Sequence, residues 1–455
     1  MDLAIRNGTV VNAGGSFPAD VGVREGRIVQ VGGEVPRAAR EIDARGKQVL
    51  PGCVDIHTHL SAANTGPPLD DFVSGSRAAL AGGVTTVCDF AWQTDGGSLL
   101  GAVEAAKADA AGKAIVDFTF HTVLRDPHDG AIEELSQVAA AGAGLKVFMS
   151  APRFDHRADQ YLRALAAAGR AGILIAVHAE DAAIIQLRTR QLLAEGKTGP
   201  EHFPASRPVL AEAVAVRRAI AFAEAAEAPI YLVHLSSAAA IAPLAEAKRQ
   251  GLPVYGETRP IYLYLTEERF AEPERRGALY VGQPPLRPRS DVEAVWDALR
   301  SGPLDTVCTD HIPYTRARKL DPALDFSRIP PGMSNLETLL PMLYSEGVRT
   351  GRITLPRLVE LLATNPARLA GLAPRKGAIA PGADADLVVF DPERTRTIRA
   401  PEMQSAADYD VFEGWGVTGW PEITISRGEV VFEDGRVTGQ PGRGQFVPRA
   451  AFSGM

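Results

Sequence analysis

The chain has little cysteine and no long apolar run, and each shortage excludes a class of protein. Three cysteines among 455 residues cannot make the disulfide framework of a small secreted protein. Cys53, Cys88 and Cys308 lie in or beside apolar runs, so we expect buried, reduced thiols. No apolar run approaches the roughly 18 residues that a membrane span needs, and the first residues lack the basic-then-apolar order of a signal peptide. We therefore expect a cytoplasmic protein with no membrane partner.

Positive charge is also in short supply. Lys and Arg total 48 against 55 Asp and Glu, a net charge of −7, which gives no electrostatic footprint for nucleic acid or an anionic membrane. Hydrophobic residues are 45% and charged residues 23% of the chain, which is ordinary globular usage and excludes a disordered chain. The 44 glycines and 33 prolines predict many tight loops. The composition therefore predicts neither a nucleic-acid nor a membrane partner.

Short apolar runs recur along the chain, with Ala-rich, helix-like stretches between them. Most runs are continuous rather than alternating, which is typical of parallel strands buried on both faces. Eight such strands alternating with helices over about 320 residues predict an α/β fold, a (β/α)8 TIM barrel. The runs are Val54–Leu60, Val84–Phe90, Phe118–Leu124, Leu145–Met149, Ile173–His178, Ile230–Leu235, Pro253–Glu257 and Thr306–Asp310.

The two ends of the chain have a different sequence pattern, in which short strand-like segments lie between Gly-rich turns. These pieces are Leu3–Val11, Asp20–Val23, Arg27–Val31 and Gln48–Leu50 at one end, and Asp386–Phe390, Glu422–Ile425, Glu429–Phe432 and Arg436–Val437 at the other. We expect them to pair into one small composite β-sandwich domain. Helix-like segments Ser334–Glu346 and Leu355–Thr364 would close the barrel. The predicted boundaries are 1–50 and 375–455 for the two parts of the β domain, the second with a tail, and 51–374 for the barrel.

Histidines and an aspartate recur where the predicted barrel strands end. His57 and His59 end the first run, and because residues i and i+2 of a strand point to the same side, both imidazoles can face one metal ion. Alone, this spacing is a weak signal that two surface or core histidines would also give. However, His178, His234 and Asp310 lie at or near the ends of runs five, six and eight, the rim at which barrel active sites form. Their shared position favours a metal site.

Lys146 lies inside run four. A lysine in so apolar a strand is almost never buried without a partner, and one interpretation is a core lysine paired with a hidden carboxylate. The other interpretation is functional. Desolvation depresses the pKa of the amine and leaves it neutral, and a neutral amine can react with CO₂ to give a carbamate, an anionic ligand able to bridge two cations.

At these residues the chain resembles a known family. Pro51–His59 looks like the opening metal motif of the amidohydrolase superfamily, and Gly144–Met149 resembles the carboxylated-lysine strand of its cyclic amidohydrolases, which are hydantoinases, dihydropyrimidinases, allantoinases and dihydroorotases. The segments around His178, His234 and Asp310 look like the remaining ligand motifs, in the family's order. Further similarity covers nearly the whole chain, in Glu195–Pro200, Ser206–Pro208, Lys376–Gly377, Gly382–Leu387, Asp408–Gly414 and Ser426–Gly428.

The resemblance implies a metal-dependent hydrolase that opens the amide bond of a cyclic amide or ureide, of the hydantoinase or dihydropyrimidinase type. It implies two divalent ions, usually Zn²⁺, with His57, His59, carboxylated Lys146 and Asp310 on one ion and Lys146, His178 and His234 on the other. A hydroxide bridging the ions would attack the ring carbonyl, with Asp310 as the catalytic base and then acid. Tetramers are common among similar proteins, so a homotetramer is implied by analogy.

Three positions depart from the family's pattern and, together with Arg153, bear on the substrate. Ala151 stands where hydantoinases and dihydropyrimidinases usually have a Tyr that helps to hold the oxyanion, and Gln283 and Pro331 replace a common Ser and a common Asn. Arg153 has the charge to bind an acidic substituent, although an exposed loop arginine fits its position as well. We expect substrate-binding roles at these four positions. The segment Gly332–Thr338 looks nearer to allantoinases and L-hydantoinases, so an allantoinase or a cyclic imide hydrolase is the alternative.

Other functions fit less well. A dihydroorotase usually has an Arg where this chain has Ser61. A non-catalytic scaffold related to dihydropyrimidinases should have lost metal ligands, and here all six positions are filled. A mononuclear deaminase of the same superfamily should lack Lys146. Among the remaining residues, His121 and Trp92 either line the pocket or pack in the core, and strand alternation points His311 away from the site.

Overall fold

The structure is a computed structural model that describes residues 1–61 and 69–455. Eight parallel strands form one curled sheet in sequence order, as the apolar runs predict. The sheet closes into a barrel where its two edges meet, because the Asp310 amide donates to the carbonyl of His57 (2.8 Å) and the His59 amide donates to that of His311 (2.9 Å). The strands are β8 (Cys53–Asp55), β9 (Val84–Trp92), β10 (Asp117–Val123), β11 (Gly144–Phe148), β12 (Ile175–His178), β13 (Ile230–Leu232), β14 (Val254–Thr258) and β15 (Thr306–Val307).

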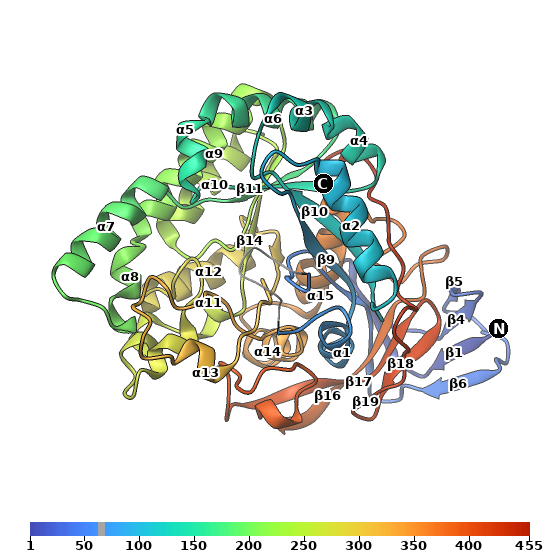
Figure 1. Ribbon diagram of the computed structural model, residues 1–455. Coiled ribbons are helices and arrows are strands. Elements are labelled where there is room, and N and C mark those ends of the chain that lie inside the picture. Colours follow the sequence, from blue (N-terminus) through green and yellow to red (C-terminus); the bar gives the residue numbers. More distant parts are fainter. Residues whose placement is uncertain (62–68) are drawn as a thin grey trace.

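Helices follow the barrel strands and cover their outer faces (Figure 1). In α6, the buried residues Tyr161, Ala164, Leu165 and Ala168 recur at helical spacing, so one stripe faces the barrel and the rest faces water. The covering helices are α1 (Ser74–Ala81), α2 (Leu99–Ala111), α4 (Leu135–Ala140), α6 (Ala158–Arg170), α9 (Val209–Ala226), α10 (Ala238–Arg249) and α12 (Arg289–Ser301).

The loops between strands and helices carry further short elements. They are α3 (Asp129–Glu133), α5 (Pro152–His156), α7 (Ala182–Ala194), α8 (Phe203–Ser206), α11 (Ile261–Tyr264) and α13 (Arg316–Lys319), with the 3₁₀ segments η1 (Pro200–His202), η2 (Glu267–Ala271), η3 (Arg276–Tyr280) and η6 (Ala400–Glu402). After the last strand, α14 (Leu339–Leu343) continues as the π-helix η4 (Tyr344–Val348), and α15 (Leu355–Val359) continues through the π-helix η5 (Glu360–Thr364) into α16 (Asn365–Leu369). The first of these helices begins five residues later than the sequence predicts.

Side chains fill the barrel interior. Val54, Cys88, Ala176, Tyr231 and Cys308 come from different strands or strand ends and belong to one buried cluster, as expected for a barrel whose inside is packed rather than hollow. The three cysteines are all buried and free, which confirms the expectation of reduced thiols. No helix in the described part of the chain is long and apolar enough to cross a membrane.

Strands from both ends of the chain pair beside the barrel, where Figure 1 shows blue and red-orange arrows together. A seven-stranded sheet has the order β19-β18-β17-β16-β7-β2-β3, and a four-stranded sheet has the order β5-β4-β1-β6. Strand β7 of the N-terminal part pairs antiparallel with β16 of the C-terminal part, Val49 opposite Val389. The strands are β1 (Leu3–Arg6), β2 (Thr9–Asn12), β3 (Gly15–Pro18), β4 (Val21–Arg24), β5 (Arg27–Val31), β6 (Arg40–Asp43), β7 (Gln48–Pro51), β16 (Leu387–Thr397), β17 (Gly416–Ser426), β18 (Glu429–Glu433) and β19 (Arg436–Val437).

The last residues leave this sheet and return to the barrel. Phe446 lies beside Phe118, whose amide donates to the carbonyl of Gln445 (2.9 Å) and whose carbonyl accepts from the amide of Val447 (2.8 Å). Arg449 then reaches inward, and its guanidinium donates to Cys88 Sγ (2.7 Å) and Thr119 Oγ1 (3.3 Å). This tail therefore covers the end of the barrel at which the strands begin and leaves the opposite end for the site.

Candidate metal centre

The six predicted metal ligands lie together where the barrel strands end. His57, His59, His178, His234 and Asp310 line one cavity of about 210 Å³. Lys146 lies in β11, which pairs with β12, the strand that ends at His178. The other lining residues are Trp92, Phe148, Arg259, Gln283, Ile312, Tyr314, Pro331 and Gly332.

Three of these side chains already have the spacing of metal ligands. Asp310 Oδ1 lies 2.9 Å from His59 Nε2 and 3.3 Å from His57 Nε2, and the potential ligand atoms of the three residues all lie within 4.8 Å of one another. The other two histidines are adjacent, since the rings of His178 and His234 are 4.6 Å apart and those of His57 and His234 are 5.5 Å apart. The histidines therefore form one continuous group.

The amine of Lys146 is buried in apolar surroundings. The residue is 0% exposed, and its Nζ lies 5.3 Å and 5.1 Å from the ring centres of Phe90 and Phe148. Desolvation lowers the pKa of Lys146 to about 8, although the charges of Glu257 and Asp310 oppose this shift. A substantial neutral fraction is therefore present near pH 8, as carbamate formation requires.

Several polar atoms here are buried without a hydrogen-bond partner among the described residues. Among them are Nζ of Lys146, Nδ1 of His59 and Nδ1 of His234. Burial lowers the pKa values of His57, His178 and His234, so their imidazoles are neutral, the form that binds a metal. Because unpaired buried polar atoms are costly, this donor set fits a pair of divalent cations better than a packed core.

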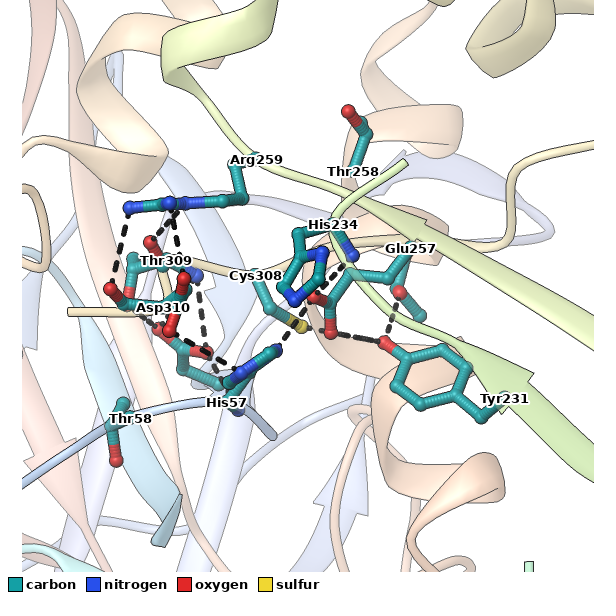
Figure 2. A network of polar contacts seen from close by, with 12 residues as sticks. His57, Thr58, Tyr231, His234, Glu257, Thr258, Arg259, Cys308, Thr309 and Asp310 are labelled. Atoms are coloured by element: carbon teal, nitrogen blue, oxygen red, sulfur yellow. Dashed lines mark hydrogen bonds and ion pairs between the residues drawn. The ribbon is translucent and has the colours of Figure 1, made fainter. Parts of the chain in front are cut away.

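A buried carboxylate orients His57 and the segment of His234 (Figure 2). Glu257 Oε1 lies 2.7 Å from His57 Nδ1 and accepts from the amide of His234 (3.0 Å), while its Oε2 accepts from the hydroxyl of Tyr231 (2.7 Å). Burial by itself raises the pKa of Glu257, but His57, the hydroxyl of Tyr231 and the charge of Lys146 together outweigh it and lower the pKa. Since Glu257 holds Nδ1, the nitrogen that remains for a metal is His57 Nε2.

A buried carboxylate also orients His178. Its Nε2 lies 2.8 Å from Glu180 Oε2, and the guanidinium of Arg207 binds both oxygens of Glu180. This leaves His178 Nδ1 for a ligand. No role was predicted for Glu257, whose one signal in the sequence is a carboxylate at the end of a strand-like run.

The predicted substrate-binding residues divide between two cavities. Gln283 and Pro331 line the cavity of the histidines. Ala151 and Arg153 line a neighbouring cavity of about 360 Å³, and Trp92 and Phe148 line both. The guanidinium of Arg153 pairs with Asp95, at 2.8 Å and 3.2 Å, so its charge is already balanced by a carboxylate.

Two histidines outside the ligand set have other surroundings. His311 Nε2 lies 2.9 Å from Asp70, and its Nδ1 accepts from the amides of Asn335 and Leu336. These contacts agree with the prediction that His311 points away from the site. His121 is buried and stacks on Phe90, and it is not among the residues that line the cavity. Trp92, in contrast, does line it.

Comparison with known proteins agrees with this geometry. Residues 48–431 match the model of the amidohydrolase family. The chain belongs to the amidohydrolase family. Within it, the chain is 40% identical to a D-hydantoinase of Rhizobium radiobacter, over 99% of this chain and all of the relative.

Solved structures of the family superpose on the whole chain. A D-hydantoinase from a Bacillus sp. has a TM-score of 0.97 at 41% identity, covering 99% of this chain and 100% of the other. A dihydropyrimidinase from Brevibacillus agri has a TM-score of 0.96 at 39% identity, covering 100% of both chains. The similarity therefore includes the barrel and the sheets built from the two chain ends.

Proposed function

We propose that this amidohydrolase opens the ring amide bond of a cyclic ureide, of the hydantoin or dihydropyrimidine type, with two divalent cations. The observation that carries the proposal is Lys146, a buried amine beside four histidines and Asp310 that has no hydrogen-bond partner in the described part of the chain. The names of the relatives, D-hydantoinase and dihydropyrimidinase, support the same chemistry. Allantoin and cyclic imides are the alternative substrates, because Gln283 and Pro331 alter the lining of the cavity.

The chain would hold the two ions with the residues predicted from the sequence. His57, His59 and Asp310 would bind the first ion, His178 and His234 the second, and Lys146 both after carboxylation by CO₂. Neutral imidazoles and anionic oxygens suit Zn²⁺. When bound, such a pair activates water as a nucleophile and polarises a carbonyl. The homotetramer implied by the resemblance remains a prediction, which light scattering of the purified protein tests.

Asp310 would move the proton. Burial by itself raises the pKa of this carboxylate, but Arg259, His57 and His59 lower it well below its ordinary value, so it is ionised and able to accept. It takes the proton of the attacking water and returns it to the ring nitrogen as the C–N bond breaks, acting first as base and then as acid. The product is a ring-opened N-carbamoyl or amide acid.

Gln283 would recognise the ring. Gln283 lines the cavity of the histidines, and its backbone segment is fixed because Lys319 Nζ donates to the carbonyls of Val281 (2.7 Å) and Gly332 (2.8 Å). A carboxamide presents a donor and an acceptor side by side. A ring holds its amide cis, with N–H and C=O on one side, whereas open-chain secondary amides favour trans by about 2.5 kcal/mol. Pairing with Gln283 would therefore favour cyclic over open-chain amides.

A substituent on the ring would extend toward the neighbouring cavity. Trp92 and Phe148, which stack with ring centres 5.7 Å apart, separate the two cavities. Ala151 adds little bulk to the second cavity, and Arg153 with its partner Asp95 supplies a polar edge. We therefore expect substituted rings to be accepted, with contacts to Ala151 and Arg153.

The proposal is tested by assaying the zinc-loaded enzyme on a panel of compounds. The panel holds hydantoin, both enantiomers of a 5-substituted hydantoin, dihydrouracil, allantoin, dihydroorotate and succinimide, with Asp310→Asn as the matched inactive control. We expect turnover of a hydantoin or dihydrouracil by the wild type and at least a 100-fold lower rate for Asp310→Asn, in the range of removing a general acid–base. Turnover of dihydroorotate alone, or of no compound by protein with a full complement of zinc, would refute the proposal.

A further inference from the structure

Arg259 is a buried arginine in direct contact with Asp310. It follows β14, lines the cavity of the histidines and is 0% exposed. Its Nη1 lies 3.0 Å from Asp310 Oδ2, while Asp310 Oδ1 is the oxygen near His57 and His59. Figure 2 shows the guanidinium on one side of the carboxylate and His57 on the other. The two oxygens of Asp310 therefore have different partners.

The guanidinium also holds the backbone that carries Asp310. Its Nε donates to the carbonyl of Thr309 (3.2 Å), and its Nη2 donates to the carbonyl of Asp310 itself (3.4 Å). Asp310 has φ of +48°, a left-handed conformation that is uncommon for residues other than glycine, although aspartate tolerates it better than most. Because the planar guanidinium has donors in a fixed fork, it fixes this backbone and the carboxylate together.

We propose that Arg259 is a positioning residue for Asp310. It forms an ion pair with Oδ2 and donates hydrogen bonds to both carbonyls, and it thereby presents Oδ1 to His57 and His59 and keeps the carboxylate from rotating about its Cβ–Cγ bond. The proposal rests on the proposed function for the role of Asp310 in proton transfer. A buried ion pair contributes little net stability on average, so stability alone gives no reason for an arginine here.

The test separates positioning from a general structural role. The variants are Arg259→Met, which removes the donors at similar length, and Arg259→Lys, which keeps the charge but not the fork. The matched control is Arg427→Met, since Arg427 Nε pairs with the buried Asp117 Oδ1 (3.2 Å) where β10 begins, at the other end of the barrel. Each protein is measured for zinc per chain, for kcat and KM, and for the visible spectrum of its Co²⁺ form.

We expect Arg259→Met to keep its zinc and its KM within threefold, and to lose kcat by about 10–100-fold, the range for residues that orient metal ligands. Its Co²⁺ spectrum should change, because the carboxylate is free to bind through both oxygens. Arg259→Lys should recover part of the kcat, and Arg427→Met should keep the wild-type spectrum and kcat. If Arg259→Met does not fold, the same comparison is made with Arg259→Gln.

Two results would overturn the proposal. One is a kcat of Arg259→Met within threefold of wild type with an unchanged Co²⁺ spectrum. The other is a loss of zinc in proportion to the loss of kcat, which indicates a structural role only. If the wild type binds metal but turns over none of the panel, the proposed function fails and the Co²⁺ spectra alone decide. A changed spectrum for Arg259→Met beside an unchanged Arg427→Met then supports positioning, and equal spectra refute it.

Discussion

Replacing Glu257 by Gln should weaken metal binding without disturbing the packing around it. Glu257 accepts from His57, His234 and Tyr231, at 2.7, 3.0 and 2.7 Å. Gln keeps one oxygen, so the first two contacts can persist, but the partner of His57 becomes neutral. A hydrogen bond to a charged group contributes about 1.5–3 kcal/mol and a neutral one about 0.5–1.5 kcal/mol.

These values lead to a definite expectation for Glu257→Gln. The weaker hydrogen bond to His57 should reduce the free energy of zinc binding by about 1 kcal/mol, and the lost contact with Tyr231 should reduce it by about 1 kcal/mol more. A total of about 2 kcal/mol corresponds to roughly a 30-fold weaker affinity, within the 10–100-fold range for partners of metal-binding histidines. The dissociation constant for zinc, measured by competition with a chelator, should rise by that factor.

A second variant separates charge from packing. Tyr231→Phe removes the contact to Oε2 and keeps the carboxylate, so it should weaken zinc binding by less than about fivefold, or about 1 kcal/mol. Equal effects of Tyr231→Phe and Glu257→Gln, or an unchanged affinity in Glu257→Gln, would refute the reasoning that the charge of Glu257 orients His57.

Three further predictions concern pH and stability. Reconstitution of metal-free protein with zinc, at a dissolved CO₂ concentration held constant across the pH series, should accelerate from pH 7 to 9 and then level. The reason is that a pKa of Lys146 near 8 makes the neutral amine about a tenth of the total at pH 7 and nine tenths at pH 9. A rate that does not vary with pH at constant CO₂ contradicts this. Lys376→Met should lower the free energy of unfolding in urea by about 3–5 kcal/mol, since Nζ lies within 2.9 Å of three carboxylates; an unchanged midpoint contradicts it. Phe446→Ala should lower the free energy of unfolding by about 2 kcal/mol, because its ring is half-buried against Phe118 and Phe120. This is less than the roughly 3–5 kcal/mol for a fully buried Phe. A lower melting temperature would support the prediction, and an unchanged one would contradict it.

The barrel was predictable because its strands are buried on both faces. All seven residues of β10 are buried, so the strand appears in the sequence as an apolar run, and the same holds for most of the eight. The strands of the β domain were harder to predict. In β6 only Ile42 is buried, so hydrophobic patterning did not predict this strand. Strand β16 continues past Phe390 with partly or fully exposed residues, so the predicted strand Asp386–Phe390 is too short.

The metal ligands were predictable for a different reason. Their positions at strand ends place them on one rim whatever the details of the loops. The residues that orient these ligands were not predictable, because they are distant in sequence. Glu257 is 200 residues from His57, and Arg259 is 51 residues from Asp310. The role of a carboxylate or guanidinium at the end of a strand can be assigned only when the residues that it contacts on other strands are known. The pairing of Arg153 with Asp95, 58 residues earlier, illustrates the same limit.

Metal analysis of the wild type and Lys146→Ala, both loaded with zinc in bicarbonate and then passed through a desalting column, tests the central claim most directly. The claim is that carboxylated Lys146 joins two ions in the centre formed by the histidines and Asp310. It predicts close to two zinc ions per wild-type chain and one or fewer in Lys146→Ala. Two ions retained by folded Lys146→Ala, or none bound by the wild type, would contradict it.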